Sequence, residues 1–183
     1  MRVAVCDYGA GNVRSVLAAL ARLGADARST RDPDDVIAAD LVVLPGVGSA
    51  ASAMSGLREC GLDAALRSRV GAGGLTLGIC LGLQLALEES EEDGGTPALG
   101  LLPGRAKRLR KGRVPRIGWA RVEPGGESFY FAHSYTAETP TASARSEGIV
   151  AAAQAGSFLG VQFHPEKSGA AGARFLARCL SRA

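Results

Sequence analysis

The sequence predicts an α/β fold: a mixed, largely parallel sheet flanked by helices, with antiparallel strands added in the second half. In the first half, short apolar runs alternate with amphipathic stretches, which indicates parallel strands covered by helices. In the second half, short extended segments separated by Gly or Pro follow one another without long helical patterns, which favours hairpins. In such a fold, function is expected at the carboxyl ends of the parallel strands.

The first half predicts four strands, at residues 2–6, 25–30, 41–44 and 75–79. The apolar spacing after residue 12 predicts a helix that Gly24 ends, and Asp32-Pro33 reads as the N-cap and first residue of a short helix. A helical region of mixed pattern covers about 49–70, and a further helix is expected over 81–89.

The acidic run at 88–95 reads as an exposed polar connection without chemistry. Extended segments are then expected at about 106–109, 117–122, 128–132, 143–145, 149–153 and 158–163. An amphipathic helix at 169–182 closes the chain. Because no repeat, linker or composition boundary interrupts this order, residues 1–183 are expected to form a single domain.

Composition excludes several classes of protein. The chain of 183 residues is 46% hydrophobic and 21% charged, and its net charge of +3 is too small to indicate nucleic acid or a membrane as partner. Its four cysteines have no C-x-x-C spacing, which argues against structural zinc and against a disulfide framework. Without a signal-type segment or a long apolar run, the expected location is the cytoplasm.

The stretch Gly78-Ile79-Cys80-Leu81-Gly82 reads as a nucleophile elbow, in which a buried strand turns abruptly into a helix. The unpaired N–H groups at a helix N-terminus favour a thiolate over a thiol. Taken alone, the motif is equally compatible with a structural cysteine on a glycine-rich turn. The choice therefore depends on other residues.

His164 and Glu166 supply the other parts of a catalytic triad. Pro165 favours extended backbone at His164, so the two side chains are expected on the same side, with the carboxylate taking one imidazole N–H and leaving the other nitrogen for a thiol. Together with the elbow at Cys80, this combination indicates acyl transfer.

An oxyanion formed in such a reaction needs two N–H donors. The backbone N–H of Leu81, directly after the nucleophile, supplies one. The turn Pro45-Gly46-Val47-Gly48 follows a strand that should neighbour the elbow strand, so the N–H of Val47 is the second candidate. The glycines there fit a plain turn equally well.

Together, the elbow with Gln84 and the segment Phe163-His164-Pro165-Glu166 resemble the class I, triad-type glutamine amidotransferase family. The resemblance implies that Cys80 attacks the carboxamide of glutamine, that His164 transfers protons and that Glu166 orients His164. It also implies that Gln84, Gly46 and Gly48, and the segment His133-Ser134-Tyr135, hold the substrate, and that no metal or organic cofactor is required.

Further motifs narrow the resemblance within the family: Asp7-Tyr8-Gly9-Ala10-Gly11-Asn12, the Pro45–Gly48 turn, Gly118-Trp119 and the extension Lys167-Ser168-Gly169. They are similar to glutaminase subunits that pass ammonia, as 1:1 heterodimers, to a (β/α)8 cyclase of histidine biosynthesis. Two alternatives stay open: the glutaminase subunit of another amidotransferase, such as pyridoxal phosphate synthase, and an inactive scaffold subunit.

Two positions depart from that pattern, since Arg116 replaces a usual histidine and Ala120 a usual asparagine. A basic cluster surrounds the first of them, at Arg105, Lys107, Arg108, Arg110, Lys111, Arg113 and Arg116. It lacks interleaved aromatics, so it reads first as a solvated hairpin face and second as a rim that meets the partner.

Overall fold

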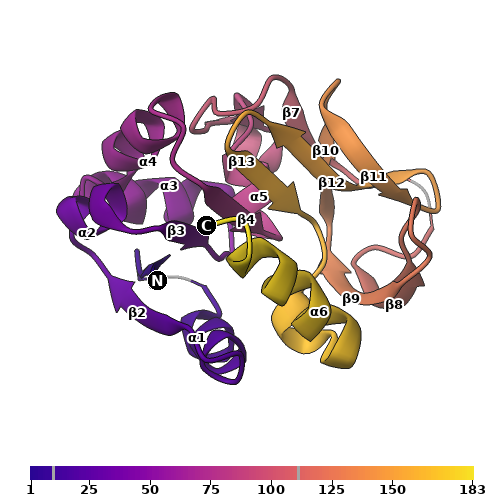
Figure 1. Ribbon diagram of the computed structural model, residues 1–183. Coiled ribbons are helices and arrows are strands. Elements are labelled where there is room, and N and C mark those ends of the chain that lie inside the picture. Colours follow the sequence, from indigo (N-terminus) through magenta and orange to yellow (C-terminus); the bar gives the residue numbers. More distant parts are fainter. Residues whose placement is uncertain (10, 111) are drawn as a thin grey trace.

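A computed structural model describes residues 1–9, 11–110 and 112–183 (Figure 1). It confirms the predicted fold: a mostly parallel seven-stranded sheet lies between two layers of helices, and two small sheets join it in the second half of the chain. Ala10 of the opening motif and Lys111 of the basic cluster lie outside the described residues.

The strands are β1 (Arg2–Cys6), β2 (Asp26–Thr30), β3 (Leu41–Leu44), β4 (Thr76–Ile79), β5 (Glu89–Ser90), β6 (Thr96–Pro97), β7 (Arg105–Arg108), β8 (Arg116–Arg121), β9 (Ser128–His133), β10 (Tyr135–Glu138), β11 (Ala142–Ser146), β12 (Ile149–Ala155) and β13 (Phe158–Val161). The α-helices are α1 (Val13–Ala21), α2 (Pro33–Ala38), α3 (Ala50–Glu59), α4 (Leu62–Gly71), α5 (Leu81–Leu85) and α6 (Gly169–Leu180), with 3-10 turns η1 (Glu92–Gly94) and η2 (Pro165–Lys167).

The large sheet has the order β11-β12-β13-β4-β3-β1-β2. Its strands from β2 to β13 run parallel, whereas β12 and β11 are antiparallel. The elbow strand β4 is central, with β3 on one side and β13 on the other. The segments that follow these three strands therefore meet at one edge, and they carry Val47, Cys80 and His164.

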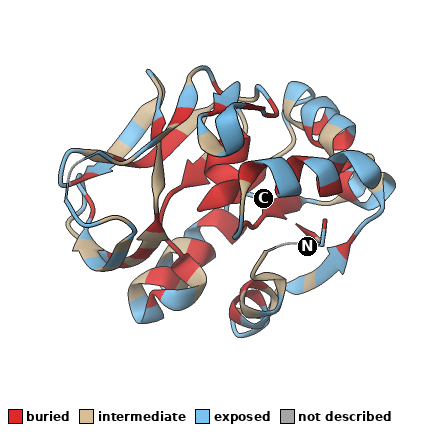
Figure 2. Ribbon diagram, turned by 180° about the vertical axis from the view of Figure 1, so that it is seen from behind, coloured by how far each residue is buried: buried red, intermediate tan, exposed pale blue. Residues whose placement is uncertain are grey.

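Alternate strand residues feed two cores on opposite faces of the sheet. One core joins α1, α6 and β9 to side chains such as Val5 and Ile79. The other joins α2 to α5 to side chains such as Cys6 and Leu44. Because β3 and β4 are covered on both faces, every residue in them is buried, and Figure 2 shows the buried residues concentrated in the central strands and α5.

Several local predictions are wrong. The helix expected over 81–89 ends at Leu85, because the chain turns back and forms β5, which pairs with β6 and β7. The helical region expected at about 49–70 is confirmed, and it consists of two helices, α3 and α4, separated at Gly61, whose φ of 70° is left-handed. The segment expected at 158–163 among the added antiparallel strands forms β13, which is antiparallel to β12 but parallel to β4. Strand β10 follows β9 after a single residue and is missing from the predicted strands.

The acidic run at 88–95 is more than a solvated loop. The carboxylate of Glu92 accepts the N–H of Ala50, at the first residue of α3, at 2.8 Å. Glu88 and Glu91 accept the N–H groups of Gly104 and Arg108 at 2.8 and 3.2 Å. These contacts tie the run to α3 and β7.

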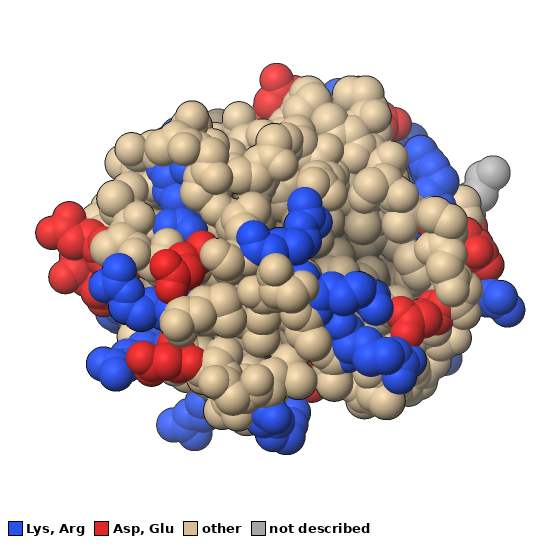
Figure 3. Space-filling view, in the orientation of Figure 1, with Lys and Arg blue, Asp and Glu red and all other residues tan. Residues whose placement is uncertain are grey.

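Charged side chains are distributed over the surface. On the face in Figure 3, positive and negative side chains are interspersed. In the basic cluster, Lys107 and Arg105 pair with Glu138, and Arg116 pairs with Glu147. Within the described ranges, no helix is both long and apolar enough to cross a membrane.

Candidate active site

The elbow lies where β4 gives way to α5. Cys80 has φ 53° and ψ −105°, a strained conformation for a residue with a Cβ, and its N–H donates to the Val161 carbonyl at 2.7 Å. A Cβ on Gly82 would overlap the Leu44 carbonyl oxygen, so only glycine lets α5 start this close to β3. The predicted strand–elbow–helix geometry at Cys80 is present.

His164 and Glu166 form a buried pair directly after β13. The Nδ1–H of His164 donates to Glu166 Oε1 at 2.8 Å, and the two side chains are only 2% and 1% exposed. Asn12 Nδ2 donates to the same carboxylate oxygen at 3.2 Å. Asn12 precedes α1 but makes no side-chain cap there, since its amide is directed to Glu166 instead.

The backbone around His164 is also fixed. Its N–H donates to the Tyr130 carbonyl of β9 at 2.8 Å, and its carbonyl accepts the hydroxyl of Ser168 at 2.6 Å. Burial alone would lower the pKa of His164, but its side-chain interactions with Cys80 and Glu166 outweigh burial and raise the pKa to about 9. The imidazole beside Cys80 is therefore charged at neutral pH.

The turn that contains Val47 packs directly on the elbow. A Cβ on Gly46 would lie 2.6 Å from Leu81 Cβ and 2.9 Å from Gly82 N, so the backbone of the turn touches the start of α5. The hydroxyl of Tyr8 donates to the Pro45 carbonyl at 2.6 Å and anchors the turn from the end of β1. Val47 itself is 40% exposed.

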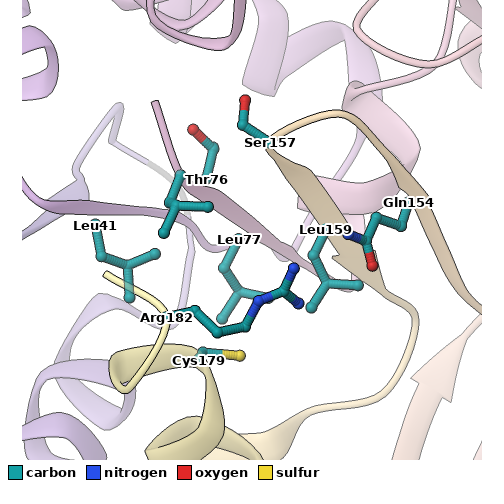
Figure 4. Close-up of a pocket in the computed structure, with 9 residues that line it drawn as sticks. Leu41, Thr76, Leu77, Gln154, Ser157, Leu159, Cys179 and Arg182 are labelled. Carbon is teal, nitrogen blue, oxygen red and sulfur yellow. The ribbon is translucent and has the colours of Figure 1, made fainter. Parts of the chain in front are cut away.

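A cavity of about 310 Å³ opens at the elbow. It is lined by Val47, Gly48, Cys80, Leu81, Gln84, Glu92, Pro115, Ile117, Ala132, His133, Ser134 and Tyr135. Most of the residues proposed from the sequence thus meet around one space of a size typical for small-molecule sites. A second hollow, at the opposite ends of the strands beside Arg182 and Cys179, holds only about 30 Å³ (Figure 4).

One backbone carbonyl organises the polar wall of the cavity. The Tyr135 carbonyl accepts His133 Nδ1–H at 2.8 Å and Gln84 Nε2–H at 2.9 Å. A carbonyl can only accept, so the neutral form of His133 carries its proton on Nδ1. Burial lowers the pKa of His133 to about 4, and the charge of Arg116 acts in the same direction. His133 is therefore neutral at pH 7, as suits a positioning residue.

Two further residues belong to the site. Glu92 lines the cavity, and burial raises the pKa of its carboxyl. Sequence reasoning did not find Glu92, because it lies in an acidic run with several carboxylates and no periodic pattern distinguishes one from another. Asn12 closes the opening motif, and that motif is the signal that could have directed attention to it.

The departures at Arg116 and Ala120 lie on β8. The Arg116 guanidinium lies 4.2 Å above the Phe131 ring and donates to Ser146 Oγ at 2.8 Å and Glu147 at 3.0 Å. Arg116 therefore joins β8 to the end of β11. Ala120 lies opposite Phe129 of β9 and packs, partly buried, against the core.

Nothing in the described part of the chain gathers three His, Cys, Asp or Glu side chains as a metal site would require. The four cysteines are free thiols. The polar side chains of the cavity are the Cys80 thiol, the Gln84 amide, the neutral His133 imidazole and the Glu92 carboxylate, and the His164–Glu166 pair lies behind Cys80 without lining the cavity.

The opposite environments of the two histidines predict an unusual titration. Neither imidazole C–H resonance should shift between about pH 5.5 and 7.5 in an NMR titration, because the pKa values of about 4 and about 9 lie outside that range. The raised pKa of His164 stabilises the folded state fully below pH 6.5, the ordinary pKa of histidine, and this stabilisation is lost as the pH rises through about 9. The lowered pKa of His133 has the opposite effect: its contribution to stability is present above pH 6.5 and is lost as the pH falls through about 4. A histidine resonance with a midpoint near 6.5 would contradict these two assignments.

A family model and individual relatives of this chain point to the same family. Residues 4–183 match the family model described as glutamine amidotransferase class-I. The chain is 45% identical to imidazole glycerol phosphate synthase subunit HisH of Moorella thermoacetica, over 95% of this chain and 91% of that protein. The protein of the same name in Symbiobacterium thermophilum is 43% identical, over 96% and 92% of the two chains.

Solved structures share the fold at lower identity. A crystal structure of a glutamine amidotransferase superposes with a TM-score of 0.83 at 23% identity, covering 99% of both chains. The structure of PurLQS from Thermotoga maritima gives a TM-score of 0.72 at 19% identity, covering 99% of this chain and 97% of that one. The full-length family match and the close relatives show that this chain belongs to the class-I glutamine amidotransferase family.

Proposed function

We propose that residues 1–183 act as one glutamine amidotransferase domain that hydrolyses glutamine and supplies the ammonia to the cyclase of imidazole glycerol phosphate synthesis. The observation that carries the proposal is the meeting of Cys80 with the buried His164–Glu166 pair beside a cavity of about 310 Å³. The assignment to imidazole glycerol phosphate synthesis is supported by relatives named as subunits of imidazole glycerol phosphate synthase, which are more than two-fifths identical over nearly the whole chain. The cyclase as recipient of the ammonia is part of the proposal.

In the first half-reaction, the Cys80 thiolate attacks the carboxamide carbon of glutamine. The oxygen gains negative charge, which the N–H groups of Leu81 and Val47 receive in this proposal. The C–N bond then breaks as the His164 imidazolium gives its proton to the departing nitrogen. Ammonia leaves, and a γ-glutamyl thioester remains on Cys80.

In the second half-reaction, His164 is neutral and acts as a base toward water. The water oxygen attacks the thioester carbon, its proton moves to His164, and the C–S bond breaks to release glutamate. This step regenerates the thiolate and the imidazolium. Glu166, held by Asn12, keeps the imidazole in the orientation that both steps need.

The polar wall of the cavity suits the amino-acid end of glutamine. Glu92 offers a carboxylate for the α-ammonium group, and Gln84 with the backbone of His133, Ser134 and Tyr135 offers further polar groups. Gly48 lines the cavity, and Gly46 lets the turn approach the elbow without a Cβ clash. Glutamine is thereby placed with its carboxamide at Cys80.

We assign the docking face to strand β8, at the mouth of the cavity, with the (β/α)8 cyclase bound 1:1. Ile117 and Trp119 are 64% and 59% exposed, and Val47, across the same cavity, is 40% exposed. Outward positions of a strand are normally polar, so two large apolar side chains there indicate a partner surface. Ile117 also lines the cavity, so a partner on β8 would cover the site from which ammonia leaves.

The direct test is ammonia release from glutamine with and without a liganded cyclase. We expect slow release by the free chain and a marked increase on addition of the cyclase. Cys80→Ala should reduce release by roughly 10³-fold or more while still binding the cyclase. Cys60→Ala, at a half-buried cysteine outside the cavity, should behave as the parent chain. Retained hydrolysis in Cys80→Ala would refute the nucleophile, and no stimulation by the cyclase would refute the partner.

Glu92→Gln should raise the KM for glutamine about tenfold with little change in kcat, because it removes a charge from the cavity but keeps an acceptor for the Ala50 N–H. Asp93→Asn is the matched control, since Asp93 contacts the neighbouring Ala51 N–H at 3.3 Å and does not line the cavity. Steady-state kinetics measure both variants. Equal KM values for Glu92→Gln and Asp93→Asn would show that Glu92 does not bind glutamine.

Trp119→Lys should weaken cyclase binding at least tenfold, because it replaces an exposed apolar anchor with a charge. Basal ammonia release by the free chain should stay within about twofold of the parent, since Trp119 does not line the cavity. Titration calorimetry with the cyclase measures the first quantity. Arg121→Lys, at the next outward position of β8, is the control, and unchanged affinity in Trp119→Lys would exclude this face.

A further inference from the structure

A fully buried glutamine touches the nucleophile and has no part in the steps above. Gln162 directly follows β13, has 0% exposure, and directs its Nε2 to Cys80 Sγ at 3.6 Å. Its own N–H donates to the Ala151 carbonyl at 2.9 Å, which fixes its backbone. Gln162 does not line the cavity, so it cannot act by holding substrate.

Hydrogen bonding fixes the direction of the Gln162 amide. Gln84 must direct its nitrogen to the Tyr135 carbonyl, because that oxygen only accepts. The same nitrogen donates to Gln162 Oε1 at 3.1 Å. With its oxygen committed to Gln84, Gln162 can present only its N–H groups to the sulfur.

The surroundings of Cys80 make such a donor significant. Cys80 is 5% exposed, so a thiolate there has lost most of its water and needs protein donors in exchange. The Cys80 thiol can donate to the Ala132 carbonyl, 3.8 Å from Sγ, a bond that is lost on ionisation. The bond from Gln162 acts in the opposite sense, because an N–H donor binds a charged sulfur more strongly than a neutral one.

We propose that Gln162 is a positioning residue for the nucleophile: its Nε2–H, aimed by Gln84, holds the sulfur of Cys80 and stabilises the thiolate relative to the thiol. The inference deepens the proposed function, because the thiolate is the attacking group there. The other titratable groups that act on or near the sulfur are His164 and Tyr8, Glu92 across the cavity and, behind His164, Glu166 and His133. All five remain in the variants below, so they do not produce the differences expected.

The experiment measures alkylation of Cys80 by iodoacetamide against pH in the full chain, with peptide mass spectrometry to separate Cys80 from the other cysteines. Gln162→Met removes the donor at similar size. We expect the midpoint pH for Cys80 alkylation to rise by about one unit and the rate at pH 7 to fall about tenfold, as one hydrogen bond to a charged group implies. For glutamine hydrolysis, kcat should fall while KM stays within about twofold.

Gln154→Met is the matched control. Gln154 lies on β12 at the small hollow of Figure 4, away from the elbow, and its replacement should leave the alkylation midpoint unchanged. Gln84→Met supplies a second variant in case Gln162→Met does not fold. It removes the group that aims Gln162, so it should raise the midpoint in the same direction by a smaller amount.

A folded Gln162→Met chain, or a folded Gln84→Met chain if the first is unstable, with the parent midpoint would overturn the inference. Alkylation requires neither glutamine nor a cyclase. A shifted midpoint therefore supports the role of Gln162 even if the ammonia assay refutes the proposed function, and the two failures can be told apart.

Discussion

The strained backbone of Cys80 is the constraint on which the site depends. Its φ of 53° and ψ of −105° correspond to a cost of about 1–3 kcal/mol for a residue with a Cβ. Both neighbouring strands contact this turn: the Val161 carbonyl at the end of β13 accepts the Cys80 N–H at 2.7 Å, and Gly82 lies so close to the Leu44 carbonyl of β3 that a Cβ there would overlap it. Cys80 is therefore held at the centre of the sheet, between the two strands that flank β4.

Sequence reasoning locates the parts of the site that depend on local pattern. A buried strand followed by Gly-x-Cys-x-Gly, and a His-Pro-Glu segment after another strand, each constrain their own backbone, and parallel strands bring their carboxyl ends together. The same reasoning fails where tertiary pairing decides structure. The pattern at 81–89 is helical throughout, yet the helix stops at Leu85 because Glu89 and Ser90 gain strand partners from later in the chain.

The hydrogen bonds between side chains in the site could not be predicted from the sequence, for a different reason. Asn12 and Glu166 are separated by 154 positions, and Gln162 and Cys80 by 82. No periodicity links such residues, and an amide side chain in isolation gives no sign of which partner it will choose. Glu92 could not be selected from the sequence either, because the acidic run at 88–95 contains several carboxylates. Only the contact of this run with α3 brings one of them, Glu92, to the cavity.

Strand pairing connects the exposed face of β8 to Cys80 and His164. In the β8–β9 register, Trp119 lies opposite Tyr130, whose carbonyl accepts the His164 N–H at 2.8 Å. Ile117 lies opposite Ala132, whose carbonyl is 3.8 Å from Cys80 Sγ. Each of these two exposed apolar residues is therefore paired with a residue whose carbonyl contacts Cys80 or His164. At the sulfur, the Ala132 carbonyl is an acceptor that favours the thiol, whereas the Gln162 amide is a donor that favours the thiolate, so the two groups bear on Cys80 in opposite senses.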